Sequence, residues 1–566
     1  MSSLGAKSFR FSLGDWLWNA AITGFINIVE HSGEKIQIKD DGVEFSTNVL
    51  EDFSEKYFAY FTDTYQKTLS WYKLVSYKKV IESYKDSNFA NLDLDGLKKV
   101  NVFIKDVAKK LLTSSSYKAA FELIGLQERM TDLEKKLHKV NEPKTEEEFI
   151  KQKDNIKNEI EHQFSLIEDI IEYCNSAEGK KYITAKNIIY TIIRNGWDSV
   201  SFLNPQTKEK DMFKDFENYF VKDAVDYLES DKQKYRYQCF NCGMPIKDLK
   251  NDLSFINEVG FDVARKPSHV WNYNNDIAIC PLCKLVYSCL PAGFIYVNDS
   301  GLFINANIDM NYMLSVNRNV KQSVLQEIGG VLTTQKLYQA LVESLRKQEL
   351  EKSKFELSDI QVVRFRKGTY RFNILPHAII KLINNHHQEI STLFRTGYKE
   401  GGDRYSIYEQ VLDRVINNQN LFSFLYRLLH LKLSSPMNCF FSTDHIFDIL
   451  SINFEMIKNI GGMQGMDNNR DILKEARGAG YYLRQEYIKG DRNINKIPGI
   501  SYRLLNALKT NNRNMFMDTL LNCYLYVRKE VPNVFLSMFE DDDQFRTIGY
   551  AFMTGFIDEK KEVINN

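Results

Sequence analysis

The sequence has no excess of charge of either sign and contains little proline. Its 566 residues include 74 basic and 74 acidic side chains, so the net charge favours neither nucleic acid nor a membrane surface as a partner. Only 10 prolines occur, against 31 tyrosines and 37 phenylalanines. This composition excludes a long disordered tail and is typical of a well-packed, helix-rich protein.

Long apolar runs are also missing. The first residues, 1–7, form no apolar signal-peptide region, and no uncharged apolar stretch reaches the roughly 20 residues that span a bilayer. We therefore expect a cytoplasmic protein that has no membrane partner and keeps its eight cysteines reduced.

Catalytic motifs are equally scarce. No G-x-x-x-x-G-K-[ST] sequence is present, so a loop for nucleoside triphosphates is not supported. His386-His387 and Asp444-His445 lack an H-E-x-x-H pattern or spaced carboxylates, and consecutive side chains of the acidic run 540–543 point in different directions. The sequence therefore predicts a protein that is not an enzyme.

Two pairs of cysteines in the middle of the chain are its strongest motif. Cys239-Phe-Asn-Cys242 and Cys280-Pro-Leu-Cys283 are C-x-x-C knuckles with 37 residues between them, and Gly243 supplies the positive φ that such turns often need. No histidine or open ligand position accompanies them. We therefore predict a structural Zn²⁺ site within a subdomain at 235–290. Four reduced buried thiols and a redox dithiol are the alternatives.

The remaining pattern predicts an α+β protein that is predominantly helical. The expected elements are a helix capped by Ser12 that runs through Ile28, a hairpin at 36–45 with Asp-Gly at its turn, helices over 52–125, a helix from Thr145 to about Tyr173, and strands at 293–297 and 301–304. From about residue 320 we expect an almost wholly helical chain with one interruption at 361–374.

We expect three domains along the chain, because a single core does not extend over this length. The predicted limits are 1–325 for a mixed α/β domain that includes the zinc-knuckle subdomain, 326–430 for a helical middle region, and 431–566 for a C-terminal helical bundle.

The interruption at 361–374 predicts a basic β-hairpin with Lys367-Gly368 as its turn. The side chains expected to face the core are Val363, Phe365, Tyr370 and Phe372. The opposite face then carries Arg364, Arg366 and Arg371. Three arginines on one face repel one another unless an anion lies across them, so either phosphate groups or acidic side chains of another segment are expected there.

A second basic concentration lies between residues 470 and 513, where ten basic and four acidic residues give a net charge of +6. The candidate nucleic-acid ligands in it are Arg470, Lys474, Arg477, Arg484, Arg492, Lys496 and Arg503. The first four share one face of a helix. Tyr481, Tyr482 and Tyr487 interleave with them and are suited to stacking on bases. The alternative is a solvated helix face.

Short motifs occur in an order that points to a family. Gly14-Asp15-Trp16-Leu17 precedes the segment 19–24, the two cysteine knuckles follow in the middle, and the segment 545–556 lies near the end of a helical region. In this order, and over essentially its full length, the chain resembles the large subunit of type I-B CRISPR Cascade complexes. Of these motifs, only the zinc knuckles are strong alone.

The resemblance implies a non-catalytic subunit of a prokaryotic RNA-guided complex that acts in antiviral defence. Large subunits of this family lie near the 5′ handle of the guide RNA, read the protospacer-adjacent motif in target double-stranded DNA, and stabilise the displaced strand of the R-loop. Recognition beyond that motif is delegated to guide pairing. The other implied partners are the remaining Cascade subunits and a recruited helicase-nuclease.

Relatives can also produce a separate small subunit from an internal start. Candidate starts in this chain are Met437, Met456, Met463 and Met466. Each would give a helical product that keeps the basic concentration.

The residues that read the adjacent motif have no sharp template. The candidates near the zinc region are Asn272, Asn274, Asn275 and Lys284, because Asn and Lys side chains can reach base edges, although an Asn-rich loop is often simply a turn. Two other function classes stay open. One is a zinc-dependent nucleic-acid-processing enzyme, and the other is a scaffold that contacts only protein.

Overall fold

The structure is a computed structural model of the full chain. It describes residues 8–259, 270–271, 274–275, 277–298, 300–307, 309–326, 334–350, 360–366, 368–459, 461, 470–489 and 494–558. The chain forms two compact units. Unit 1 consists of residues 1–332 and 362–372, and unit 2 consists of residues 333–361 and 373–566. The described part is mostly helical with small sheets, as the sequence predicts.

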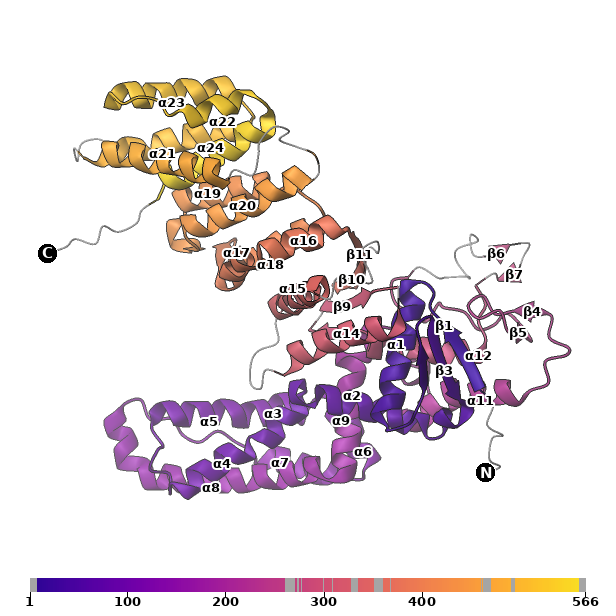
Figure 1. The fold of residues 1–566 in the computed structure, drawn as a ribbon. Helices are drawn as coiled ribbons and strands as arrows, with labels where there is room; N and C mark the ends of the chain where they lie inside the picture. The colour runs from indigo at the N-terminus through magenta and orange to yellow at the C-terminus, as the bar shows by residue number, and fades with distance from the viewer. Residues whose placement is uncertain are drawn as a thin grey trace. The chain divides into compact units, whose positions relative to one another are not determined.

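The first helix of the chain, α1 (Trp16–His31), is largely buried and forms part of the core of unit 1 (Figure 1). Asp15 caps this helix by accepting a hydrogen bond from the Trp18 N–H, so the predicted cap at Ser12 is wrong; Ser12 ends strand β1 instead.

The remaining helices of unit 1 are α2 (Phe53–Tyr65), α3 (Ser70–Ser76), α4 (Lys78–Asp86), α5 (Leu94–Asp106), α6 (Ser115–Leu123), α7 (Gln127–Lys136), α8 (Glu146–Asn175), α9 (Ala177–Thr191), α10 (Met212–Phe216), α11 (Lys222–Glu229), α12 (Pro281–Ser288), α13 (Leu290–Gly293) and α14 (Met310–Leu325).

A three-stranded antiparallel sheet packs on α1. Its strands are β1 (Ser8–Ser12), β3 (Gly42–Ser46) and β2 (Gln37–Lys39), in that order. The predicted hairpin at 36–45 is confirmed. Its turn is Asp40-Asp41 rather than Asp-Gly, because Gly42 already pairs with Lys39 in the ladder.

The long helix predicted after the capping box is also confirmed. Thr145 caps α8 by accepting a hydrogen bond from the Glu148 N–H, and the helix extends to Asn175. The residues that recur at helical spacing on its buried face are Phe149, Ile156, Ile160, Phe164, Ile167 and Ile171. They pack against α3, α4, α5, α7 and α9 of the same unit, so α8 lies along a domain face.

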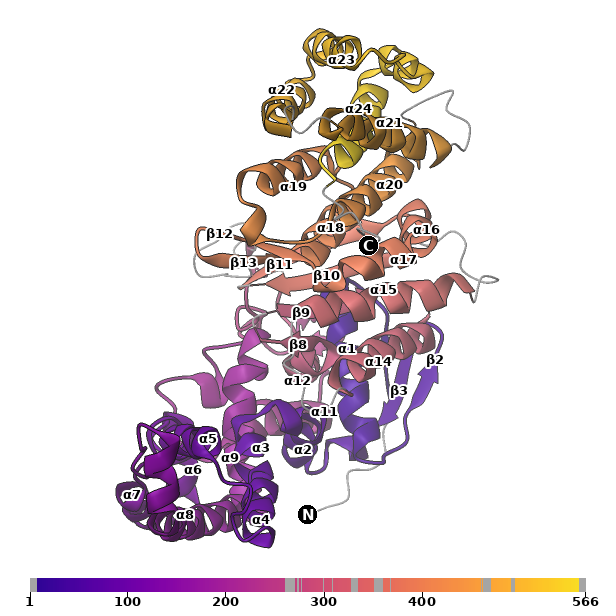
Figure 2. The same ribbon diagram turned by 90° about the vertical axis from the view of Figure 1, so that its left-hand side faces the viewer.

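A second sheet of unit 1 contains the predicted hairpin. The strand order is β11-β10-β9-β8, with β8 (Ile295–Val297), β9 (Ser300–Asn305), β10 (Ile360–Arg366) and β11 (Thr369–Leu375). Helices α1 and α14 contact this sheet (Figure 2). The strands expected at 293–297 and 301–304 are therefore confirmed, and the hairpin joins their sheet.

Unit 2 is a helical assembly with one small sheet. Its helices are α15 (Thr334–Leu350), α16 (His377–Asn385), α17 (His387–Thr392), α18 (Ile407–Ile416), α19 (Phe422–Ser434), α20 (Thr443–Asn459), α21 (Arg470–Ile488), α22 (Ile497–Lys509), α23 (Arg513–Val527) and α24 (Asp542–Phe556). The sheet, in order β13-β12-β14, consists of β13 (Asp403–Ser406), β12 (Gly397–Glu400) and β14 (Cys439–Phe440). The expectation of a single interruption after residue 320 is therefore wrong. The missed signal is Gly401-Gly402, whose φ values of 59° and 91° form the tight turn between β12 and β13.

Among the described residues, no helix has the length and the apolar character needed to cross a bilayer.

Candidate metal centre and nucleic-acid interface

The four cysteines of the two knuckles converge on one point in unit 1. The Sγ atoms of Cys239, Cys242, Cys280 and Cys283 all lie within 4.8 Å of one another. The Cys242 and Cys280 sulfurs are 3.7 Å apart, and a tetrahedral zinc ion with Zn–S bonds of about 2.3 Å requires sulfurs about 3.8 Å apart. The group is thus able to hold a metal such as zinc, and its ligand set suits that ion.

Local structure explains how the first knuckle is formed. Short strands β4 (Tyr237–Gln238) and β5 (Pro245–Ile246) pair on either side of it, so the chain must reverse within the six residues between them. The Gly243 N–H donates to the Cys239 carbonyl (2.9 Å), and Gly243 has a φ of +69°. A side chain is strained in that conformation, which explains glycine at this position.

The second knuckle uses a helix start. Cys280 is the N-cap of α12, Pro281 follows at the first helical position, and the Cys283 N–H donates to the Cys280 sulfur (3.3 Å). The Cys280 N–H donates in turn to the Cys239 sulfur (3.2 Å). Backbone N–H groups therefore point at the sulfurs and stabilise negative charge on them.

Three of the four cysteines of the centre are buried, and Cys242 is half-buried. Cys239, Cys280 and Cys283 are at most 2% exposed. Hydrogen bonds from the other three thiols, Cys242 first, lower the pKa of Cys239, whereas burial raises the pKa of Cys283. Asn241 donates its Nδ2–H to the Cys283 sulfur (3.6 Å) and accepts from the Tyr287 hydroxyl (3.0 Å), which fixes the knuckle against α12.

The motif-reading candidates lie along the same segment. Asn274 and Asn275 form β7, which pairs with β6 (Val270–Trp271), and Asn272 lies outside the described residues. Lys284 is only 6% exposed, and its ammonium lies 3.8 Å from the centre of the Tyr219 ring. Burial lowers the pKa of Lys284, and a role for it in reading DNA stays a prediction.

The arginines of the β10–β11 hairpin do not share one exposure. Arg366 and Arg371 are exposed, whereas Arg364 is 8% exposed. Val363, Phe365 and Tyr370 join the core of unit 1 as predicted. Phe372 is 47% exposed, although its ring lies 5.0 Å from that of Trp16.

Helix α21 of unit 2 carries the centre of the second basic concentration. A cavity of about 500 Å³ opens beside it. The residues that line this α21 cavity are Phe447, Lys474, Arg477, Gly478, Tyr481, Tyr482 and Asp558. The structure thus brings together two of the predicted cations and two of the predicted tyrosines, and Tyr482 is 70% exposed.

Two of the predicted cations on α21 have partners inside unit 2. Arg477 pairs with Asp444 and with Asp558 (3.4 Å), and its guanidinium lies over the Phe447 ring at 4.9 Å. Arg484 is 8% exposed and donates to the Phe556 carbonyl (3.2 Å). Tyr487 is 3% exposed, so its ring is part of the core. Sequence spacing did not indicate which of these side chains the neighbouring helix α24 covers, and the shared basic face stays a prediction.

The other predicted cations lie on neighbouring segments. Lys496 lies against Tyr526, to whose hydroxyl it donates (3.0 Å), and Arg503 is exposed on α22. Arg492 lies outside the described residues, as does the side chain of Arg470.

Comparison with known proteins identifies the segment around the cysteines. Residues 232–295 match the family described as CRISPR-associated protein (Cas_CXXC_CXXC). The chain is a CRISPR-associated protein. The match covers both knuckles, β4, β5, α12 and α13. No curated protein and no solved structure gave a match. A CRISPR-associated protein has a role in CRISPR immunity, and the four-cysteine centre is the part of this chain that carries the family's signature.

Proposed function

We propose that this CRISPR-associated protein is the non-catalytic large subunit of a type I-B Cascade complex. It binds the guide RNA and the target DNA, reads the protospacer-adjacent motif, and stabilises the R-loop. The resemblance of the full sequence to such subunits supports the assignment, and so does the family match over residues 232–295.

The observation that carries the nucleic-acid part is the α21 cavity. Lys474 and Arg477 lie there beside Tyr481 and Tyr482. Cations neutralise phosphates and aromatic rings stack on unpaired bases, so the combination suits a single strand such as the displaced strand of an R-loop. Arg477 is already paired with Asp444 and Asp558, which leaves Lys474 as the cation that offers most to a phosphate.

The four-cysteine ligand set of the centre favours a structural role for a bound zinc ion rather than a catalytic one. Four thiolates complete the coordination of a tetrahedral zinc ion, whereas catalytic zinc keeps a position for water or substrate. We propose that the centre holds the segment with Asn272, Asn274 and Asn275 in place for motif reading. A zinc-dependent processing enzyme would need a fifth or an exchangeable ligand position, and X-ray absorption at the zinc edge distinguishes the two.

Of the two candidate starts that lie among the described residues, Met437 and Met456, one suits the fold of the proposed small subunit. Met437 is 91% exposed in a short turn before α20, so a product from it keeps α20 to α24 whole. Met456 lies inside α20 and is buried, so a start there would divide that helix. Met463 and Met466 lie outside the described residues. We propose Met437 as the start.

Binding to single-stranded DNA tests the α21 cavity. In filter binding with the full chain, Tyr482→Ala is expected to weaken binding by about fivefold or more, because a stacked base contributes about 1–3 kcal/mol. Lys474→Ala is expected to reduce the slope of log affinity against log salt by about one, because one phosphate contact is lost.

Matched controls are available on unit 1. Tyr190 is an exposed tyrosine on α9 and Lys105 an exposed lysine on α5, so Tyr190→Ala and Lys105→Ala should leave DNA binding unchanged. If the α21 variants behave like these controls, the protein-only scaffold replaces the proposed function.

A further inference from the structure

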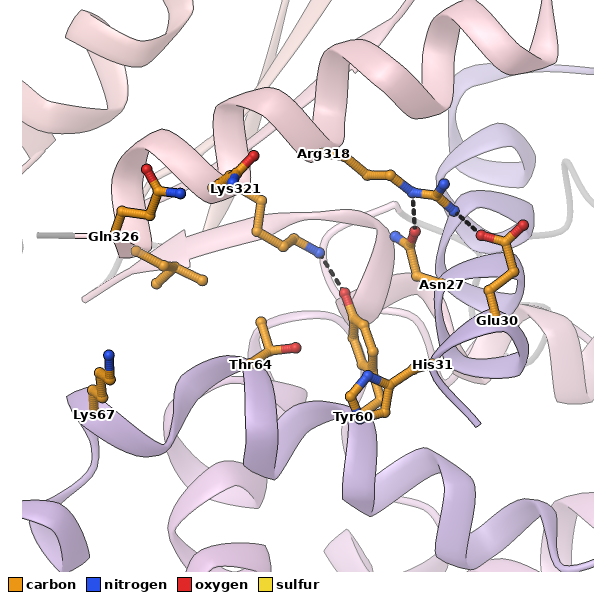
Figure 3. Close-up of a pocket in the computed structure, with 11 residues that line it drawn as sticks. Asn27, Glu30, His31, Tyr60, Thr64, Lys67, Arg318, Lys321 and Gln326 are labelled. Carbon is orange, nitrogen blue, oxygen red and sulfur yellow. Dashed lines mark hydrogen bonds and ion pairs between the residues drawn. The ribbon is translucent and has the colours of Figure 1, made fainter. Parts of the chain in front are cut away.

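Unit 1 contains a cavity that neither the cysteine centre nor α21 involves. Its volume is about 700 Å³, which lies within the range of small-molecule sites. The last turn of α1, helix α2, the short turn η2 (Gln66–Thr68) and α14 surround it (Figure 3). The residues that line this α14 cavity are Asn27, Glu30, His31, Tyr60, Thr64, Lys67, Arg318, Lys321, Gln322, Leu325 and Gln326.

The lining of the α14 cavity is positively charged. Arg318, Lys321 and Lys67 face a single carboxylate, Glu30. Glu30 already pairs with Arg318 at 2.5 Å, and Arg318 also donates to the Asn27 side chain (3.0 Å). The positive charge that remains belongs to the two lysines, which approach the cavity from α14 and η2.

Lys321 is held in the cavity by neutral groups. Its ammonium donates to the Tyr60 hydroxyl (2.6 Å) and to the Ala292 carbonyl (2.8 Å), as Figure 3 shows for the first of these bonds. Within the described part of the chain, no carboxylate forms an ion pair with it. Lys321 is half-buried, and a partly desolvated cation with only dipoles as partners has an unfavourable solvation energy that an anion in the cavity would offset.

The rest of the lining suits a ligand larger than a simple anion. Thr64, Gln322 and Gln326 offer hydroxyl and amide groups, and Leu325 offers an apolar contact. His31 is engaged elsewhere, because its Nε2 lies 3.0 Å from Asp63 and its ring lies edge-on against Tyr60 at 5.7 Å. The lining thus combines cationic side chains with neutral hydrogen-bonding groups, which a nucleotide needs for its phosphate and its base.

We propose that the α14 cavity binds a nucleotide-sized ligand through its phosphate group, with Lys321 and Lys67 as the phosphate ligands. A free nucleotide and the phosphorylated end of a single strand present the same chemistry, so both are sources to be distinguished by experiment.

Calorimetry with the full chain tests the proposal with three probes. These are AMP and a short oligothymidine with or without a 5′-phosphate. AMP or the phosphorylated strand should bind, and the one that binds more tightly identifies the source. Lys67→Ala should weaken that binding about two- to fivefold, because Lys67 is exposed. Lys321→Gln should weaken it about tenfold or more, because a charged hydrogen bond in a half-buried position is lost.

The controls separate binding from folding. Lys73 is an exposed lysine on α3, near Lys67 in sequence, so Lys73→Ala should leave affinity unchanged. Lys67→Ala alone keeps the proposal testable if Lys321→Gln fails to fold. Failure of both phosphate-bearing probes to bind would overturn the proposal, and so would equal affinity for the strand without phosphate or unchanged affinity in Lys67→Ala.

Proton uptake gives a second readout. Burial, with the nearby Arg318 as a smaller cause, lowers the pKa of Lys321 to about 7. The other groups that face it are Glu30 and His31 on α1, Tyr60 on α2, and Lys67 on η2. Because its pKa is lowered, Lys321 loses its proton more readily as the pH rises, and a bound phosphate should raise its pKa and draw a proton from the buffer. Affinity should fall as pH rises from 6 to 8, and this uptake should disappear in Lys321→Gln; uptake that persists there would contradict the assignment.

Discussion

Arg484 illustrates how a charged residue can belong to the core. It lies on the face of α21 that meets α24, and its guanidinium donates to the carbonyl of Phe556 near the end of that helix. A cation near a helix C-terminus satisfies an orphan carbonyl and interacts favourably with the helix dipole. On the next helix, α22, Arg503 is exposed. Arginines in this part of the sequence are therefore of two kinds. Some are buried and pair within the fold, and others are exposed to solvent.

Replacing Arg484 should cost stability. Arg484→Met keeps most of the volume but removes the donor, so the Phe556 carbonyl loses a charged partner. We expect the free energy of unfolding to fall by about 1.5–3 kcal/mol, measured by urea denaturation. Arg503→Met, which changes an exposed arginine, should stay within about 0.5 kcal/mol. Equal effects of the two changes would contradict the structural role of Arg484.

At the scale of elements, glycines set the closest helix contacts. A Cβ on Gly480 of α21 would lie 2.0 Å from the Phe552 carbonyl oxygen of α24, and a Cβ on Gly555 would lie 1.9 Å from the Arg477 carbonyl oxygen. In unit 1, Gly24 of α1 and Gly293 of α13 form the same reciprocal contact. Backbone meets backbone at both places, so no side-chain rotation can relieve an added methyl group.

Gly480→Ala should therefore separate α21 from α24. We expect a loss of stability of about 1–3 kcal/mol, as for other overpacked sites, measured by thermal unfolding of the full chain. Gly499 in α22 has open space around its Cβ position, so Gly499→Ala should be neutral or stabilising because alanine favours the helix. A Gly480→Ala protein as stable as the Gly499→Ala protein would show that the two helices do not pack as described.

Elements with a local signal were predictable from the sequence. The Thr145 cap, the apolar face of α8 and the 361–374 hairpin each depend on neighbours within a few residues. In the sheet β13-β12-β14, the local Gly401-Gly402 turn between β12 and β13 was overlooked, and β14 was not predictable because it joins from far along the chain. The reciprocal glycine contacts could not be predicted from the sequence either, because a glycine alone does not identify the backbone that approaches it.

At the scale of the whole molecule, the four-cysteine centre joins segments that are far apart in sequence. The two knuckles were predictable because each is a local turn, and their common target follows from metal chemistry. The α14 cavity was not predictable, because it combines α1, α2 and α14 residues between 27 and 326 whose shared position depends on the fold. Likewise, which arginines on α21 face solvent depends on α24.

Metal removal should destabilise the region around the knuckles. A ligand that binds only the folded state stabilises it by about 2.7 kcal/mol at 100 times its Kd, so a zinc chelator should lower the midpoint of thermal unfolding. Cys283→Ser should remove the bound metal, measured as zinc per chain by mass spectrometry. Cys439→Ser changes a cysteine outside the cluster and should keep the metal. Zinc retained by Cys283→Ser at the wild-type level would contradict the site.

The placement of the β10–β11 hairpin has a consequence for how the protein is made. Residues 362–372 belong to unit 1, while the segments on both sides of them belong to unit 2. Strand β9 pairs with β8, but its other edge stays open until β10 arrives, and open edges invite pairing with other chains. During synthesis, unit 1 therefore cannot complete its sheet until the ribosome has released residue 372. Fragments that end near residue 332 keep the open edge of β9. Truncated versions of the protein should therefore extend past the β10–β11 hairpin.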